Sequence, residues 1–319
     1  MKSVLTSRHL DTKTRFELRK CLSLTKLAAQ TSNLEVLKWL RRHRCFWNKE
    51  VCEIAAEKGN LELLQWARRN HCDWSVIVCN NAARAGNFEM LKWAVSSNCH
   101  INEGTCAAAA YGGHLDILLW LRSQDCDWDS STGSSAALGG HKHILEYLYN
   151  NRFLDTTHDY SLCSNAALGG HLEILLWLRQ EGCPWNEETC ANAARNGHLE
   201  ILQYARKKGC PWDTRTIASA ARGGHLQVLA WAWENGCPYH ADVYENAVAA
   251  NCMEILEWLQ MNGFTWNVYA CKMAAMCGYL EILQWLVNQG CPWDVESCLK
   301  KAKSAGHNRV VQWIIAEYK

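Results

Sequence analysis

The sequence has 319 residues, of which 49% are apolar and 20% are charged, a balance that excludes an intrinsically disordered chain. No apolar run approaches the roughly 20 residues that span a bilayer, so we expect no membrane segment and no membrane partner. The formal net charge is +1, but residues 1–50 carry 12 Lys and Arg against 4 Asp and Glu, a net charge of +8. The N-terminus lacks the apolar core of a secretory signal, which predicts a cytoplasmic protein.

Residues 1–24 do not match the pattern that fills the rest of the chain. The stretch 10–24 has the spacing of an amphipathic helix, so we predict an N-terminal cap segment over 1–24 that shields the first repeat. The segment also resembles the end of an F-box, and the alternatives of a plain cap and a degenerate F-box stay open. The residues that carry this second resemblance are Leu10, Asp11, Arg19, Lys20 and Cys21.

From residue 25 to 319 the chain repeats itself with a period of 27 residues, which predicts a solenoid. One interval, from Gly133 to Cys163, is 30 residues long and predicts a bend at 150–160. The last repeat, 298–319, is predicted as a C-terminal capping unit. The equivalent positions of successive repeats are Thr25, Cys52, Cys79, Cys106, Gly133, Cys163, Cys190, Ile217, Tyr244, Cys271 and Cys298.

Each repeat has the signals of two helices. In the best-formed repeat Asn186 is the expected N-cap, Thr189–Arg195 the first helix, Gly197 the turn and Leu199–Lys207 the second helix. A wide apolar arc on the second helix requires neighbours on both sides, so the repeats must stack. No segment alternates for long enough to form a strand. The predicted fold class is therefore all-α, a helix-turn-helix solenoid of about eleven stacked repeats.

The run from Ala193 to Leu202, Ala-Ala-x-x-Gly-His-Leu-Glu-Ile-Leu, resembles the central stretch of an ankyrin repeat. The period is 27 rather than 33, and the six missing residues fall where ankyrin repeats project a β-hairpin finger. The Cys-Pro-Trp-Asp phrase is similar to short ankyrin-like repeats of giant DNA viruses and some protists, and a viral source would imply the host cytoplasm. The resemblance implies a protein-interaction scaffold with no catalysis, no cofactor and no small-molecule substrate.

Eighteen cysteines and a row of histidines raise a redox or metal hypothesis. Equivalent residues in stacked repeats are about 8–10 Å apart, too far for a disulfide, and no pair has zinc-knuckle spacing. We interpret the cysteines as small apolar core residues. One histidine per repeat cannot converge on an ion, so we predict no metal site and a hydrogen bond at the start of each second helix. These histidines are His114, His141, His171, His198 and His225.

Tryptophans and arginines each have two interpretations. The tryptophans could stack sugars or bases, but many share one repeat position in the apolar arc, which predicts core packing. Arginines such as Arg179 close many second helices, where they either bind nucleic acid or match the helix dipole; the net charge of +1 favours the second. The tryptophans at the shared position are Trp39, Trp66, Trp93, Trp120, Trp177, Trp231, Trp258 and Trp285.

The first helices form the predicted binding face. Five residues after each repeat position, a variable residue follows the inward Ala-Ala pair, and a helical step of about 100° turns it outward. An apolar patch between arginines on this concave face would suit an acidic, partly hydrophobic protein or peptide. The predicted partner-binding residues are Arg84, Tyr111, Leu138, Leu168, Arg195 and Arg222. The alternative is a nucleic-acid or acidic-surface binder that uses the basic N-terminal end. No nucleophile–base pair or phosphate loop indicates an enzyme.

Overall fold

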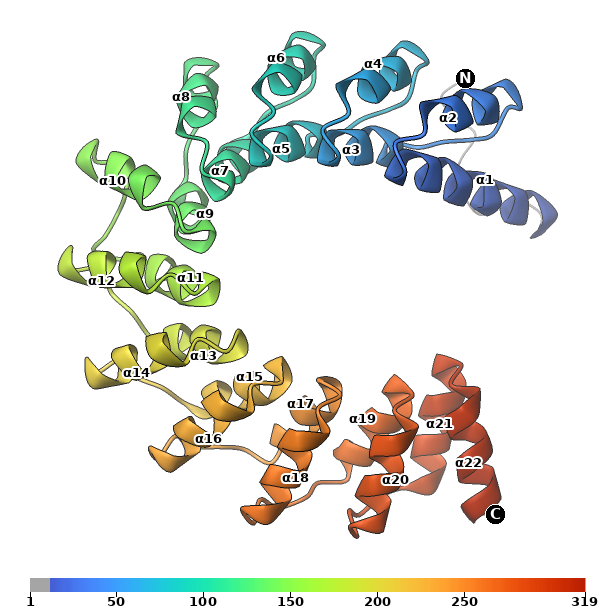
Figure 1. Cartoon of the computed structure of the whole chain (residues 1–319), viewed down its shortest axis with the longest axis vertical. Coiled ribbons are helices and arrows are strands. Elements are labelled where there is room, and N and C mark those ends of the chain that lie inside the picture. The colour runs from blue at the N-terminus through green and yellow to red at the C-terminus, as the bar shows by residue number, and fades with distance from the viewer. Residues whose placement is uncertain (1–11, 319) are drawn as a thin grey trace. The chain divides into compact units, whose positions relative to one another are not determined.

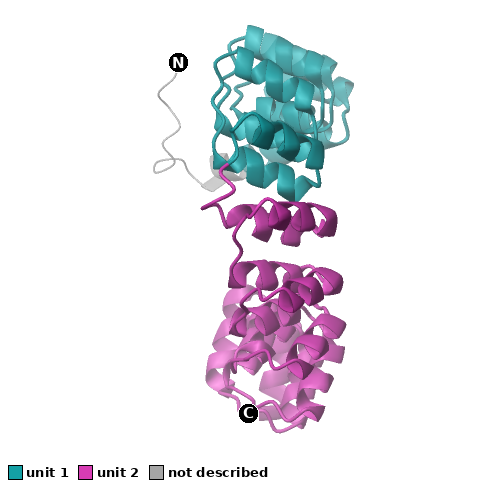
Figure 2. Cartoon of the chain, turned by 90° about the vertical axis from the view of Figure 1, so that its left-hand side faces the viewer, with its two compact units in different colours: residues 1–154 teal, residues 155–319 magenta. Residues whose placement is uncertain are grey.

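The computed structural model describes residues 12–318, with side chains described from residue 18 onward. All regular structure in this range is helical, in 22 α-helices that alternate as first and second helices of successive pairs (Figure 1). The predicted all-α helix-turn-helix solenoid is therefore confirmed. The chain divides into two compact units, Met1–Leu154 and Asp155–Lys319 (Figure 2). Their boundary falls in the interval 150–160, where a bend stays a prediction.

In the first unit the first helices lie side by side in one row and the second helices form a separate row (Figure 1). The first helices are α1 (Thr12–Gln30), α3 (Glu50–Glu57), α5 (Ile77–Arg84), α7 (Glu103–Gly112) and α9 (Ser130–Gly139). The second helices are α2 (Leu34–Arg42), α4 (Leu61–Arg69), α6 (Phe88–Ser96), α8 (Leu115–Ser123) and α10 (Lys142–Asn150).

The second unit repeats this arrangement, with first helices packed on first helices. Its first helices are α11 (Ser161–Gly169), α13 (Glu187–Arg195), α15 (Thr214–Gly223), α17 (Val243–Ala249), α19 (Tyr269–Cys277) and α21 (Val295–Ala305). Its second helices are α12 (Leu172–Gln180), α14 (Leu199–Lys207), α16 (Leu226–Glu234), α18 (Met253–Met261), α20 (Leu280–Asn288) and α22 (Asn308–Tyr318).

Local signals place the helix ends. The Asn186 side chain accepts a hydrogen bond of 3.1 Å from the backbone N–H of Glu188, as expected of an N-cap. Gly197 has a φ of 78°, a left-handed conformation that glycine adopts without a Cβ penalty. The helix α1 runs without a break through the expected junction between residues 24 and 25, and the N-terminal cap over 1–24 stays a prediction. The F-box residues Leu10 and Asp11 lie outside the described residues.

The core of each repeat is built from small residues on the first helix and larger ones on the second. Ala193 and Ala194 of α13 are buried, as are Ile201 and Leu202 of α14. The small alanine side chains let neighbouring first helices approach closely. The larger side chains of the second helices fill the wider space between first and second helices. The outward side chains of the first helices remain at the surface, and the candidate site lies among them.

Candidate functional site

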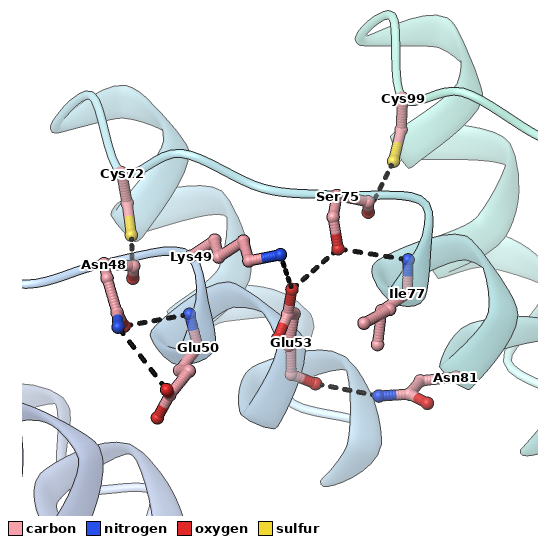
Figure 3. A network of polar contacts seen from close by, with 9 residues as sticks. All are labelled: Asn48, Lys49, Glu50, Glu53, Cys72, Ser75, Ile77, Asn81 and Cys99. Carbon is pink, nitrogen blue, oxygen red and sulfur yellow. Dashed lines mark hydrogen bonds and ion pairs between the residues drawn. The ribbon is translucent and has the colours of Figure 1, made fainter.

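Loop cysteines link each repeat to the one before it. The thiol of Cys72 donates to the carbonyl oxygen of Asn48 at 3.2 Å, and the thiol of Cys99 donates to that of Ser75 at 3.5 Å (Figure 3). These thiols are buried, as predicted, but they are also hydrogen-bond donors, which the sequence interpretation missed. The same contact recurs for Cys126 with Asn102, Cys183 with Asp159, Cys210 with Asn186, Cys237 with Asp213 and Cys291 with Asn267.

A first-helix cysteine lies beside the loop cysteine of the same repeat. The Sγ atoms of Cys106 and Cys126 are 2.9 Å apart. The hydrogen bond to Cys126 and burial both raise the pKa of the Cys106 thiol. Our sequence interpretation compared cysteines at equivalent positions of stacked repeats, whereas these two neighbours are 20 residues apart in sequence. All 18 cysteines are free thiols, all of them in the described part of the chain.

Arginines at the ends of second helices hold the following loop. The Arg179 Cζ atom lies 4.1 Å from the centroid of the Trp185 ring, and the same guanidinium donates to the carbonyl oxygen of Cys183. Trp185 in turn contacts Tyr204 of the next repeat, with ring centroids 6.2 Å apart. These arginines therefore do more than match a helix dipole. The same stacking joins Arg41 to Trp47, Arg68 to Trp74 and Arg206 to Trp212.

The tryptophans of the second helices are not core residues, which corrects the sequence interpretation. Trp39 is 55% exposed, and Trp66, Trp93 and Trp231 are half-buried. Each half-buried ring makes an edge-to-face contact with a tryptophan in the loop of the preceding repeat. The ring centroids of Trp66 and Trp47, for example, are 5.4 Å apart. They pack at the outer junctions between repeats.

The histidines act across repeats rather than at the start of their own helices. As N-caps, His141 and His198 make no side-chain capping bond, so that prediction is wrong. Instead, Nε2 of His141 donates to the carbonyl oxygen of Tyr111 in the preceding repeat at 2.9 Å. Burial lowers the pKa of His198, and its hydrogen bond to the backbone of Leu168 acts in the opposite direction.

Side-chain amides join neighbouring first helices in the same way. The Asn81 side chain donates to the carbonyl oxygen of Glu53 at 3.1 Å, and the Glu53 carboxylate accepts from the hydroxyl of Ser75 at 2.6 Å (Figure 3). In the second unit the Asn196 amide donates to the carbonyl oxygen of Leu168 at 2.7 Å. The backbone beneath the variable positions is therefore held by contacts from the next repeat.

The six predicted partner-binding residues are divided equally between the two units. In the first unit Arg84 is exposed and its Cζ atom lies 4.3 Å from the centroid of the Tyr111 ring, so these two side chains meet. Tyr111 and Leu138 are half-buried. Aromatic stacking leaves the guanidinium edge open for a hydrogen-bonding partner.

In the second unit Arg195 and Arg222 are exposed and line one groove of about 770 Å³ between α13, α15 and α17. Leu168 is half-buried on α11, next in the same row of equivalent positions. The groove also contains Arg215 and Asn192, which the sequence interpretation did not single out. Both lie on outward positions of first helices, so a helical projection of every repeat would have found them.

Two properties of the described residues bear on other kinds of site. No helix between residues 12 and 318 combines the length and the apolar character needed to cross a bilayer. In the same part of the chain, no three His, Cys, Asp or Glu side chains are grouped so that they could hold a metal ion.

No protein-family model matches the sequence, and no curated protein sequence matches it. Among solved structures, the chain is similar to the human ASB11 ankyrin repeat domain, with 15% identity and a TM-score of 0.36 over 50% of this chain and 84% of that chain. It is also similar to the pentatricopeptide repeat protein PPR10 in complex with an 18-nt psaJ RNA element, with 16% identity and a TM-score of 0.39 over 98% of this chain. The chain spans about half of that second structure, 54% of its length. On the arrangement of its own described helices, the chain is a helical repeat solenoid of stacked helix pairs.

Proposed function

We propose that this chain is a non-catalytic scaffold that binds a protein or peptide on the face formed by its first helices. The observation that carries the proposal is the groove of about 770 Å³ between α13, α15 and α17, with the guanidinium groups of Arg195 and Arg222 exposed on it. A concave surface with a few placed polar groups is typical of a binding site.

The backbone of this face is preorganised, which favours binding. The imidazole of His141 and the amide of Asn196 each hold a carbonyl oxygen of the preceding first helix. A face that is already ordered loses less conformational entropy when a partner binds. Histidines such as His141 and cysteines such as Cys210, which might suggest catalysis, are engaged in contacts between repeats, and this supports a non-catalytic role. A reducing, intracellular compartment would keep the thiols free.

A second candidate is a nucleic-acid or acidic-surface binder that uses the basic N-terminal end. Its support is the net charge of +8 over residues 1–50. Two of the four carboxylates in this stretch are paired, Glu50 with Lys26 at 3.2 Å and Glu35 with Lys38 at 2.6 Å, and the net charge of +8 already counts them. Binding whose affinity falls steeply with salt concentration would favour this candidate.

Selection from a random displayed-peptide library tests the first proposal and does not require an identified partner. We expect the chain to enrich peptides whose binding is lost in the variant Tyr111→Ser/Leu168→Ser, because both side chains lie on the first-helix face. A matched control, Leu119→Ser/Met261→Ser, removes two exposed apolar side chains from second helices and should leave binding unchanged. Circular dichroism would establish that both variants are folded. Peptides that depend on the control positions, or no enriched peptide at all, would contradict the proposal.

A further inference from the structure

The groove of the second unit carries two rows of side chains with different charge. At the N-terminal ends of α13, α15 and α17, the equivalent positions are Glu188, Arg215 and Asp242. Arg215 Nε lies 2.8 Å from the carboxylate of Asp213, and Asp242 lies 3.3 Å from the imidazole of His240. The positive charge of Arg215 is therefore paired, whereas Glu188 forms no ion pair among the described residues, so this end of the groove does not favour an anion.

At the C-terminal ends of α13 and α15 the positive charge is unpaired. Arg195 and Arg222 are both exposed, and among the described residues neither forms an ion pair. They are equivalent residues of adjacent repeats, about 8–10 Å apart along the stack. A Cβ atom at Gly223 would overlap the carbonyl oxygen of Arg195, so the two helices are in backbone contact where the arginines emerge. The two guanidinium groups therefore project from neighbouring positions into one groove.

Apolar side chains continue the row on both sides of the arginines. The equivalent position on α11 is Leu168, which is half-buried, and the positions on α17 and α19 are Ala249 and Met276, the latter 40% exposed. The row, which we call the arginine row, consists of Leu168, Arg195, Arg222, Ala249 and Met276. It places two adjacent guanidinium groups, each able to donate paired hydrogen bonds, between apolar side chains.

We propose that the arginine row binds an acidic peptide segment in which two carboxylates are flanked by apolar side chains. Guanidinium groups bind carboxylates through paired hydrogen bonds, and such charge-assisted bonds are stronger than neutral ones. A peptide in the polyproline II conformation rises about 3.1 Å per residue with three residues per turn, so carboxylates three residues apart lie on one side of it and match the spacing of the repeats. This proposal rests on the proposed function and specifies its ligand.

The charge of the whole unit favours a short acidic peptide over a nucleic acid. Residues 155–319 carry 13 Lys and Arg against 17 Asp and Glu, a net charge of −4. A strand of phosphates would extend its charge along the groove toward Glu188 and Asp242, where like charges repel it. An acidic peptide segment concentrates its charge at the two arginines.

Charge reversal combined with peptide selection tests the ligand class. The probe is a random displayed-peptide library, selected in parallel on the wild-type chain, on Arg195→Glu/Arg222→Glu and on Lys207→Glu/Lys208→Glu. The last variant makes the same change of net charge at exposed residues at the end of α14, on a second helix. All substituted side chains are exposed, and far-ultraviolet circular dichroism would establish that both variants keep the wild-type helix content.

We expect the wild type and the lysine control to enrich Asp and Glu pairs between apolar residues, and the arginine variant to enrich Lys or Arg instead. In fluorescence anisotropy, one enriched acidic peptide should bind Arg195→Ala/Arg222→Ala at least about tenfold more weakly than wild type. Enriched peptides that are not acidic, but that still lose binding in Tyr111→Ser/Leu168→Ser, would overturn this inference and leave the proposed function intact. A single-stranded oligonucleotide that competes with the peptide and binds more tightly would overturn the choice of a peptide ligand.

Discussion

Arg179 shows how a single side chain joins three parts of a repeat junction. It belongs to α12, stacks on Trp185 of the following loop, and donates to the carbonyl oxygen of Cys183 in that loop. Trp185 then reaches Tyr204 on α14 of the next repeat. A cation–π contact and a charge-assisted hydrogen bond thus act on the same loop.

Replacing Trp185 with alanine should lower the free energy of unfolding by about 2–3 kcal/mol. The ring is half-buried rather than fully buried, so the loss should be smaller than for a tryptophan at the centre of a core. The measurement is the urea midpoint followed by circular dichroism. Glu200→Ala, at an exposed position on α14, is the control and should change stability by less than about 0.5 kcal/mol. Equal midpoints for the two variants would show that Trp185 does not stabilise the junction.

At the scale of elements, neighbouring repeats are joined along two lines. One line runs through the loops, where each cysteine thiol donates to the preceding loop, as Cys210 does to Asn186 at 3.3 Å. The other runs through the start of the second helices, where an imidazole donates to the preceding first helix, as His307 does to Met276 at 3.0 Å. Both lines satisfy backbone carbonyls that a helix end or a loop would otherwise leave unpaired.

The histidines that hydrogen-bond to the preceding repeat should make the free energy of unfolding depend on pH. Burial lowers the pKa of His198, and the charges of His171 and His225 lower it further, so the unfolded chain binds a proton before the folded chain does. The stabilisation is therefore complete above the ordinary histidine pKa of about 6.5 and is lost as the pH falls through the lower folded value. Urea midpoints measured between about pH 7.5 and pH 5 should fall, and fall less steeply in His198→Gln.

The control for this pH dependence is His158→Gln. The His158 side chain is 86% exposed, in the loop before α11, where its imidazole lies 3.4 Å from the carboxylate of Asp155 in the same loop. This variant should keep the wild-type dependence on pH. An unchanged slope in His198→Gln would mean that other groups carry the acid destabilisation.

At the scale of the whole molecule, repeats contact mainly their neighbours in sequence, as shown by the packing of α13 on α15 and of α5 on α7. In such a chain the effect of a core substitution should stay local, because stability is a sum of repeat and nearest-neighbour contributions. Leu202→Ala, at a fully buried position on α14, should cost about 2–5 kcal/mol. Hydrogen exchange should show lost protection in α11–α16 and unchanged protection in α3–α6.

Leu91→Ala on α6 is the matched control for that experiment, since Leu91 is equally buried in the first unit. Its loss of protection should centre on α3–α8 and leave α17–α20 unchanged. A uniform loss of protection throughout the chain in both variants would show that the solenoid unfolds as one cooperative body instead.

The sequence by itself determined the helices and their pairing. The second helix predicted over Leu199–Lys207 has those bounds in the structure, and Asn186 caps the first helix as expected. These features follow from caps, a left-handed glycine and apolar periodicity, all of which act within one repeat. The 27-residue period then required the repeats to stack, because no single repeat buries its own apolar arc.

Only the tertiary structure decided which atoms meet between repeats. Periodicity shows that a histidine recurs at the position of His141, but not that Nε2 of His141 reaches the carbonyl oxygen of Tyr111. It also gave no indication that Cys106 lies against Cys126. The outer position of Trp39 was missed for a related reason, because an apolar arc on a helix covers both the core and the junctions at its edge. The groove could not be predicted from the sequence either. Its lining residues come from three helices, and the distance between these helices depends on how closely their backbones pack.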